Sequence, residues 1–318
     1  MKVLKQKITG QKDQLQIWKE LFGGEITDGK LHGKHGSINS YVFDFFELYI
    51  FQIKFEEETT VERIHTPTRF YPVLFSDEIT FEPNGEMKTI GKINKSDVTG
   101  VFFSNTTDSI TYPAKVPFSL IVLRLKESCF SHFFKDEDNF VKQINNRNPF
   151  FLYQMLTAEM KLSYSQILKN KGEDAIDKNI IYSHALLLLS LFFRETKPRL
   201  SIQTQQLTNM KRQKIVDVKN KILEDLSSPV RMKDLVLHTG MSETYIRQYF
   251  KEVFGMSINS FYQYYRIEHA KELISSCDLS VSEVAYKLGY THLGHFIRMF
   301  KKQYGMTPKK LQLLLKSD

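Results

Sequence analysis

The spacing of hydrophobic residues divides the chain into a strand-rich first part and a helix-rich remainder. Between residues 37 and 125, short runs of Val, Ile, Phe, Tyr and Thr are broken by turn-forming segments such as Pro83-Asn84-Gly85. Residues 48–55 and 117–125 have the clearest strand character. Because no long helical pattern separates these runs, they predict an antiparallel β-barrel or sandwich at about residues 37–135.

Helical periodicity replaces the strand pattern between residues 148 and 196. Pro149 is well placed to begin a helix at residues 150–170, which would end at Lys171-Gly172. A second helix is predicted at residues 177–195, where apolar residues occupy too wide a face for a helix packed on one side only. Its second contact is either the protein's own core or a second copy of the chain, so residues 177–195 are a candidate dimerisation helix.

Residues 197–210 are polar, contain Pro198 and show no hydrophobic period. We interpret this segment as an interdomain linker. The predicted organisation is an α+β chain of two domains. Residues 1–196 hold the β domain and its helices, and residues 211–318 form an all-α domain.

The C-terminal part contains a first helix-turn-helix pattern. A short amphipathic helix at residues 232–238 is followed by Gly240, which suits a left-handed turn, and by Ser242, a favoured N-cap residue. The next helix should end at Gly255. Its predicted inward side chains follow helical spacing: Ile246, Phe250 and Phe254.

The same pattern returns about fifty residues later. Val284 and Ala285 belong to the supporting helix, Gly289 supplies the turn, and Phe296 and Phe300 anchor a helix that ends at residue 305. Residues 245–257 and 295–307 share Phe, Lys, Gly and Met at matching offsets. Two such matches in register indicate two helix-turn-helix units far more strongly than one would.

The outward side chains of each second helix are candidate DNA contacts, because a helix in the major groove presents its first two turns to the base edges. An arginine suits guanine, whose O6 and N7 accept two hydrogen bonds, and a glutamine suits adenine. The predicted base-reading residues are Thr244, Arg247, Gln248, His292, Leu293, His295 and Arg298. Lysines farther along the helices are predicted to contact phosphates, with solvated surface charge as the alternative: Lys251, Lys301 and Lys302.

The charge distribution agrees with this interpretation. The net charge is +8, and residues 211–318 contain 18 Lys and Arg against 11 Asp and Glu, whereas the first 210 residues contain 26 against 25. A basic domain beside a neutral one is typical of a nucleic-acid binder joined to another module. Double-stranded DNA is therefore the expected partner.

The sequence offers little support for other chemistry. Cys129 and Cys277 are far apart and form no CxxC motif, so neither a disulfide framework nor a zinc site is expected. His32, His35 and His65 form no HxH pair, and we expect no metal and no cofactor. The charged N-terminus lacks the apolar stretch of a signal peptide, and the longest apolar run is too short to span a bilayer, so a cytoplasmic protein without a membrane segment is expected.

Residues 261–273, FYQYYRIEHAKEL, are predicted to form a long helix between the two units. Together with the strings VAYKLGY and HFIRMFKKQYGMTP, this stretch resembles the signature of the AraC/XylS family of transcription regulators, over about a third of the chain. Val236 stands where that family usually has alanine, Gly294 stands where it usually has serine, and the arginine after the terminal proline is missing. The glycine offers no side-chain contact, so the second recognition helix is expected to contribute less.

The resemblance implies a cupin-like barrel that senses a small molecule, followed by dimerising helices, and RNA polymerase as a further partner. The pattern of residues 160–195 is similar to that of a subgroup that includes siderophore-responsive regulators. Aromatic runs at residues 41–46, 49–55 and 70–75 would place alternate rings inside the barrel, where some could line an apolar ligand pocket.

The prediction is a transcription regulator that is controlled by an effector and is not an enzyme. Two alternatives stay open: a cupin-like enzyme fused to DNA-binding helices, and a non-specific architectural DNA binder. The enzyme alternative lacks a metal constellation, a nucleophile elbow or a phosphate loop in the sequence. The architectural alternative predicts equal affinity for random and selected DNA.

Overall fold

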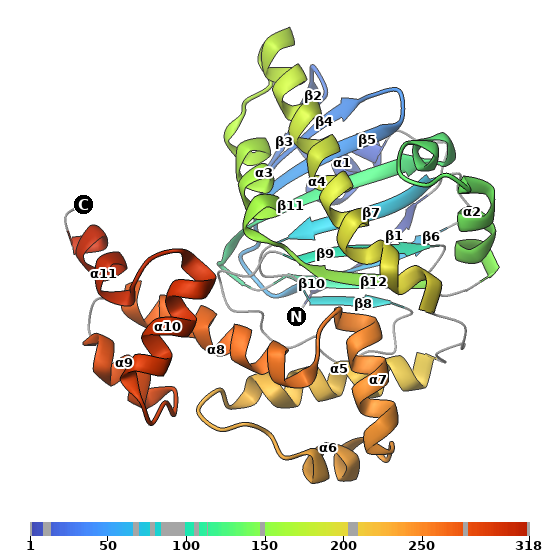
Figure 1. Ribbon diagram of the computed structural model, residues 1–318. Coiled ribbons are helices and arrows are strands. Elements are labelled where there is room, and N and C mark those ends of the chain that lie inside the picture. The colour runs from blue at the N-terminus through green and yellow to red at the C-terminus, as the bar shows by residue number, and fades with distance from the viewer. Residues whose placement is uncertain are drawn as a thin grey trace. The chain divides into compact units, whose positions relative to one another are not determined.

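The computed structural model describes residues 2–8, 14–65, 70–76, 80–83, 99–104, 108–112, 114–146, 150–202, 209–275 and 279–316. The chain divides into two compact units, Met1–Gln206 and Leu207–Asp318 (Figure 1). Each unit has its own hydrophobic core.

The N-terminal unit is built on two sheets. The larger has eight strands in the order β12-β9-β7-β11-β5-β4-β3-β2, and all its pairings are antiparallel. Its strands are β2 (Glu25–Thr27), β3 (Lys30–Gly33), β4 (Gly36–Val42), β5 (Phe46–Lys54), β7 (Phe70–Ser76), β9 (Thr99–Ser104), β11 (Pro117–Lys126) and β12 (Phe150–Met155). The smaller sheet has the order β1-β6-β10-β8, from β1 (Lys2–Ile8), β6 (Thr59–His65), β8 (Thr80–Pro83) and β10 (Asp108–Tyr112).

Neither sheet closes on itself within the described strands. The larger sheet ends at edge strands β12 and β2, and the smaller at β1 and β8. The antiparallel, strand-rich domain is confirmed. A closed barrel is not shown by the described strands, a cupin-like fold is not confirmed, and β1 pairs with β6 in parallel. Three of the edge strands, β1, β2 and β12, lie outside the predicted β region. The sequence of β1, KVLKQKI, is too polar for its hydrophobic pattern to indicate a strand.

The segment at residues 150–170 begins as a strand and continues as a helix, so the prediction of one continuous helix is wrong. Residues 150–155 form β12, which pairs with β9, and the helix begins only at α3 (Ala158–Lys169). Thr157 is the true N-cap, because its side chain accepts a hydrogen bond from the Met160 N–H at 3.3 Å. Pairing with a distant strand overrides the local helical spacing here. Pro149 lies outside the described residues.

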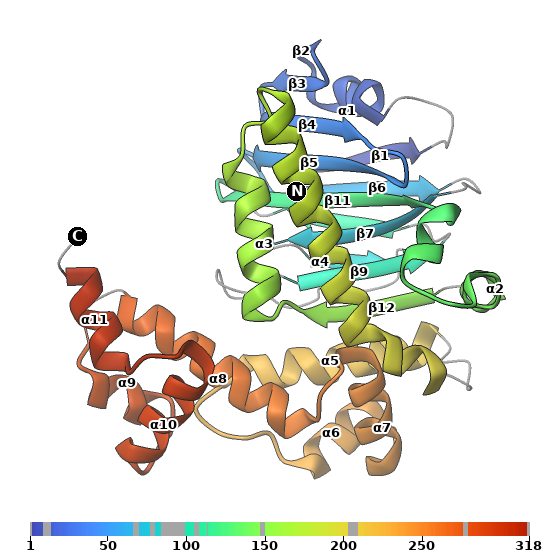
Figure 2. The ribbon, with the colours of Figure 1, turned by 45° about the horizontal axis from the view of Figure 1, so that its top comes forward.

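Helices pack on the sheets of the N-terminal unit. They are α1 (Gln14–Phe22), the 3₁₀ helix η1 (Glu127–His132), α2 (Glu137–Asn146), α3 and α4 (Ala175–Ile202). Figure 2 shows α3 and α4 side by side across one face of the larger sheet. Phe192 of α4 packs edge-on against Phe75 of β7, with 5.6 Å between ring centroids. A Cβ on Gly100 of β9 would lie 2.8 Å from the Phe75 ring and 2.9 Å from the Phe192 ring, so the missing side chain lets α4 approach the sheet closely.

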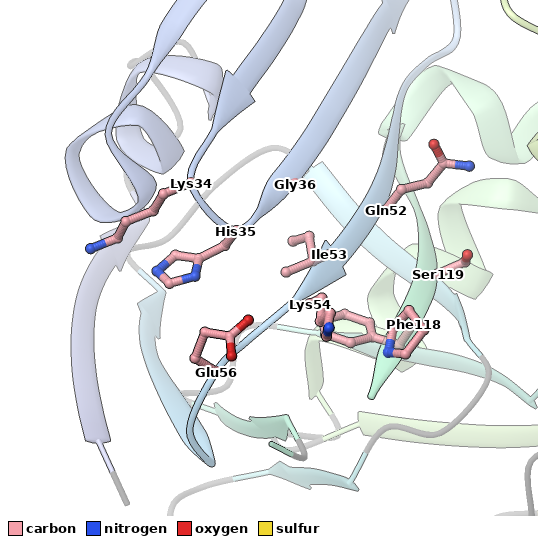
Figure 3. Close-up of a pocket in the computed structure, with 10 residues that line it drawn as sticks. Lys34, His35, Gly36, Gln52, Ile53, Lys54, Glu56, Phe118 and Ser119 are labelled. Carbon is pink, nitrogen blue, oxygen red and sulfur yellow. The ribbon is translucent and has the colours of Figure 1, made fainter. Parts of the chain in front are cut away.

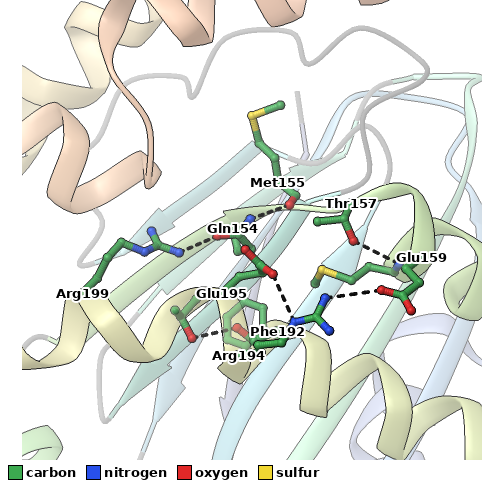
Figure 4. Close-up of polar contacts among 10 residues, drawn as sticks. Gln154, Met155, Thr157, Glu159, Phe192, Arg194, Glu195 and Arg199 are labelled. Atoms are coloured by element: carbon green, nitrogen blue, oxygen red, sulfur yellow. Dashed lines mark hydrogen bonds and ion pairs between the residues drawn. The ribbon is translucent and has the colours of Figure 1, made fainter. Parts of the chain in front are cut away.

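The C-terminal end of α4 is bonded to strand β12 (Figure 4). Arg199 donates to the Tyr153 carbonyl at 2.7 Å and to Oε1 of Gln154 at 2.6 Å. Burial lowers the pKa of Arg199 to about 10. The helix continues past Pro198 to residue 202, into the segment that was predicted to be a linker, and α5 begins at Asn209.

Residues Ala175–Arg199 are long and apolar enough to cross a membrane by length and composition alone, with a mean hydropathy of 1.3. The buried core helix of a soluble protein passes the same test. Here Ala185, Leu188, Leu189 and Phe192 are fully buried in the core of the N-terminal unit. This packing accounts for much of the wide apolar face that the sequence showed.

The C-terminal unit is helical throughout its described residues. Its helices are α5 (Asn209–Glu224), α6 (Met232–Thr239), α7 (Glu243–Phe254), α8 (Ile258–Ser275), α9 (Val281–Lys287), α10 (Leu293–Tyr304) and α11 (Pro308–Lys316). Figures 1 and 2 both show α8 running from the α6–α7 pair to the α9–α10 pair. Two helix-turn-helix units on one long helix are therefore confirmed.

Candidate nucleic-acid interface

The first helix-turn-helix unit is formed by α6 and α7. Gly240 closes α6 in the left-handed conformation, with φ of 64°. The Ser242 side chain then accepts a hydrogen bond from the Tyr245 N–H at 3.4 Å, which fixes the start of α7. Gly255, with φ of 76°, ends α7 as the sequence predicted.

The second unit is formed by α9 and α10. Ser280 and Glu283 make a reciprocal capping box at the start of α9, with hydrogen bonds of 2.7 and 3.3 Å. Hydrogen bonds to its carboxylate from the side chain and the backbone N–H of Ser280 lower the pKa of Glu283. Gly289 makes the turn with φ of 74°, and Gly305 ends α10 with φ of 72°.

Aromatic side chains hold both recognition helices, α7 and α10, to the rest of the unit. Phe250 and Phe254 of α7 pack against Phe261 of α8, with ring centroids 5.2 and 5.5 Å apart. Phe296 and Phe300 of α10 are fully buried. Since these inward positions are fixed, the opposite face of each helix is turned to solvent.

The predicted DNA contacts lie on those outer faces, in two groups. Among the predicted base readers, Leu293 is half-buried and the others are exposed: Thr244, Arg247, Gln248, His292, His295 and Arg298. The predicted phosphate contacts, Lys251, Lys301 and Lys302, are also exposed. Each group is divided between α7 and α10, with His292 at the N-cap of α10, and the roles of these residues in DNA binding remain predictions.

The two recognition helices differ in how their polar side chains are bonded. On α7, Arg247 forms an ion pair with Glu243 at 2.8 Å, and Gln248 donates to Glu252 at 2.9 Å. On α10, Arg298 makes no hydrogen bond or ion pair within the described part of the chain. The second helix carries no acid in its first turn and ends with Lys301 and Lys302. Its outer face is therefore the more uniformly basic of the two.

The hydrophobic pattern of the sequence does not predict several buried polar residues of the C-terminal unit. Arg266 and Glu268 of α8 are 7% and 1% exposed, and Gln303 of α10 donates to the Glu268 carboxylate at 2.6 Å. Gln312 of α11 donates to the Leu279 carbonyl at 2.8 Å. The available signal was a charged Arg-Ile-Glu sequence inside an aromatic-rich helix. Such charges stay buried only when they are bonded.

The N-terminal unit has an open groove of about 500 Å³ (Figure 3). It is lined by Lys34, His35, Gly36, Gln52, Ile53, Lys54, Glu56, Pro117, Phe118 and Ser119. Ile53 and Phe118 are buried, whereas Lys34, Lys54 and Glu56 are exposed. The His35 ring packs 4.8 Å from that of Phe55. Among the described residues, no three His, Cys, Asp or Glu side chains are grouped to hold a metal.

Aromatic residues of the runs at 41–46, 49–55 and 70–75 contribute to the hydrophobic core. Phe46, Phe51 and Phe75 are at most 2% exposed, and Tyr182 stacks on Phe46 at 5.7 Å. Cys129 is also buried, and this burial raises its thiol pKa to about 12. Cys277 lies outside the described residues.

Comparison with known sequences identifies the C-terminal unit. Residues 235–313 match a family described as a helix-turn-helix domain. The chain is 29% identical over 182 residues to the uncharacterized HTH-type transcriptional regulator YfiF of Bacillus subtilis, covering 54% of this chain and 56% of that protein. It is 39% identical over 67 residues to the HTH-type transcriptional activator RhaR of an Enterobacter species, covering 21% of this chain and 24% of that protein. The chain thus spans about half the length of one relative and a quarter of the other.

Solved structures with some similarity include a probable AraC family transcriptional regulator from Rhodopseudomonas palustris. It is 25% identical, with a TM-score of 0.30, over 32% of this chain and 96% of that one. The DNA-binding domain of AdpA, solved in complex with a target DNA, is 22% identical with a TM-score of 0.30, over 32% and 93% of the two chains. ToxT from Vibrio cholerae is 14% identical with a TM-score of 0.33, over 85% and 98%.

Proposed function

We propose that this chain, whose C-terminal unit is a helix-turn-helix domain of the AraC/XylS type, is a sequence-specific DNA-binding transcription regulator. The observation that carries the proposal is the pair of recognition helices, each held by buried aromatic residues and each presenting exposed polar and basic side chains. A regulator of this kind acts in the cytoplasm and engages RNA polymerase at promoters. It needs no enzymatic step.

Each recognition helix is assigned one major groove. On α7, Arg247 reads guanine, Gln248 reads adenine and Thr244 lies in the first turn beside them. On α10, His292, Leu293, His295 and Arg298 form the second reading face. The lysines at 251, 301 and 302 contact phosphates, which position the protein without specifying a sequence.

The N-terminal unit is the proposed sensor. Lys34 and Lys54 line the open groove together with the apolar Ile53 and Phe118 (Figure 3). This combination suits a small effector with an anionic group and an apolar body. Lys54→Glu should then abolish the effect of such a molecule on DNA affinity, and an unchanged response would place the effector elsewhere.

A second copy of the chain is proposed to pack along α4. Ile176, Ile180 and Leu187 are 69%, 38% and 43% exposed, and with Ser183 and Ser190 they alternate at four- and three-residue spacing, as a helix–helix seam does. Both serine hydroxyls donate to carbonyls of their own helix at 2.8 Å. Burial of this stripe would therefore leave no serine donor unsatisfied.

Selection of binding sites from random duplex DNA tests the proposal. A sequence-specific regulator should enrich one site, and at physiological salt it should bind that site about 10³-fold or more tighter than random DNA. Equal affinity for both, with the same salt dependence, would contradict the proposal. It would favour the architectural alternative, which needs a basic surface but no base reading.

A further inference from the structure

We infer that Arg266 is a positioning residue that holds the two helix-turn-helix units at one fixed separation and thereby makes DNA binding depend on the spacing between two half-sites. The inference rests on the proposed function, in which both units read DNA. It concerns a residue that is buried in α8 and therefore touches no DNA itself.

The first observation is how tightly Arg266 is held. Its Nε donates to the carbonyl of Leu288 at 2.6 Å, immediately before the turn of the second unit. Its guanidinium carbon lies 3.7 Å from the centroid of the Tyr290 ring and 5.3 Å from that of Tyr262. A planar cation packed against aromatic rings and hydrogen-bonded at its edge has one preferred orientation.

The second observation is that the surroundings of Arg266 connect the two helix-turn-helix units. The Tyr262 hydroxyl donates at 3.2 Å to the carbonyl of Leu226, in the loop that leads into α6. A Cβ on Gly289, in the turn of the second unit, would lie only 1.9 Å from the carbonyl oxygen of Ser227 in that loop. The Asp225 carboxylate fixes the loop by accepting from the Ser227 N–H at 2.8 Å and from its hydroxyl at 2.6 Å.

The third observation connects this joint to the second recognition helix. The Tyr290 ring that packs on Arg266 also contacts Phe296 and His295 of α10, at 5.2 and 5.8 Å between ring centroids. His295 is on the predicted reading face. A shift at Arg266 would therefore move that face relative to α7.

DNA geometry makes this rigidity consequential. Successive major-groove faces recur every ~34 Å, or about 10.5 base pairs, so one inserted base pair moves and rotates the second half-site away from α10. A rigid joint gives the second contact a high effective concentration at one spacing only. A loosened joint tolerates other spacings but loses part of this advantage.

A thermodynamic cycle between protein and DNA tests the inference with the full chain. The DNA probes are the selected operator, the same operator with its second half-site scrambled, and the operator with one base pair inserted between the half-sites. The protein variants are Arg266→Lys, which loses the planar contact and the Nε bond, and Tyr262→Phe, which loses only a hydroxyl. Glu272→Gln is the control, because this α8 residue pairs locally with His269 at 3.0 Å.

For the wild type and the control, scrambling or insertion should weaken binding by about 10-fold or more. Arg266→Lys should bind the scrambled operator as the wild type does, yet lose most of the extra affinity for the complete operator and most of the sensitivity to insertion. Tyr262→Phe should show the same change to a smaller, few-fold extent. If hydrogen exchange shows that the Arg266→Lys variant is unfolded, Tyr262→Phe becomes the variant that decides the test.

The two ways of failing are distinguishable. The inference alone would be overturned if a folded Arg266→Lys variant kept the wild-type coupling between half-sites. If that variant does not fold, the same result for Tyr262→Phe would overturn it. A wild-type protein that prefers no DNA sequence would overturn the proposed function and the inference with it. A merely structural arginine would lower the affinity for all three probes equally.

Discussion

The guanidinium of Arg247 lies 2.8 Å from the carboxylate of Glu243, one turn earlier on the exposed face of α7. The side chains are 58% and 55% exposed, and exposed ion pairs of this spacing contribute only about 0.3–0.5 kcal/mol. Two hydrogen bonds to guanine discriminate by about 1–3 kcal/mol. If Arg247 reads guanine as proposed, the hydrogen bonds to the base can replace its ion pair with Glu243. Random DNA would offer mainly phosphates, which repel the Glu243 carboxylate.

Glu243→Gln should consequently weaken discrimination. We expect affinity for random DNA to rise more than affinity for the selected site, and the slope of log affinity against log salt to steepen by about 1, because one repulsive charge is removed. Salt-titrated binding measures both. Glu224→Gln is the matched control, since it removes an exposed pair with Lys221 at 2.6 Å outside both recognition helices. Equal gains on both DNAs would contradict this role.

Arg247→Ala, and separately Arg298→Ala, should cost about 1–3 kcal/mol on the selected site and relax base preference at one position. The reason is the loss of a two-bond contact to a base edge. Lys301→Ala provides the comparison, because loss of a phosphate contact should weaken binding to all sequences alike and reduce the salt slope by about 1. Binding measured against a set of single-base variants separates the two patterns. A uniform loss for Arg247→Ala would reassign that residue to phosphate.

Leu187→Glu should convert a dimer into a monomer, because the charge would enter the proposed seam along α4. Sedimentation of the full chain measures the mass directly. Leu162→Glu is the control: this leucine is 60% exposed on α3, outside the α4 stripe, and its replacement should leave the mass unchanged. If the wild-type protein stayed monomeric at high concentration, the proposed dimer contact along α4 would be wrong.

Gly289→Ala should destabilise the C-terminal unit more than Gly240→Ala. Both glycines have positive φ, 74° and 64°, so both substitutions carry the conformational cost of about 1–2 kcal/mol. Only at Gly289 would the new methyl group also meet a backbone oxygen, 1.9 Å away, whereas at Gly240 the nearest atom is a lysine Nζ at 3.9 Å. Hydrogen exchange of the α6 and α9 amides reports the difference. Equal destabilisation by the two substitutions would show that the turn at Gly289 can accommodate the methyl group without an additional loss of stability.

The helix-turn-helix units could be predicted from sequence because their signals are local. Gly240, Ser242 and Gly289 each set the backbone within a few residues, and the inward Phe positions follow helical spacing. The exposure of Arg247 and Arg298 follows from that spacing too. Nothing beyond one helix needs to be known for these assignments.

The features that escaped prediction depend on residues far apart in the chain. Strand β12 exists because it pairs with β9, and its own sequence also fits a helix. Arg266 acquires its role only where α8 meets a loop from one unit and a turn from the other.

If α7 and α10 both read DNA as proposed, their unequal faces give the bound protein a direction. A two-fold symmetric reader binds its site equally well in either orientation, whereas a chain with Arg247 and Gln248 at one end and His295 and Arg298 at the other does not. Under the proposed function, each copy would therefore recognise an asymmetric site and point one way along the duplex. The order of bases in the operator would then determine which side of the protein faces the promoter.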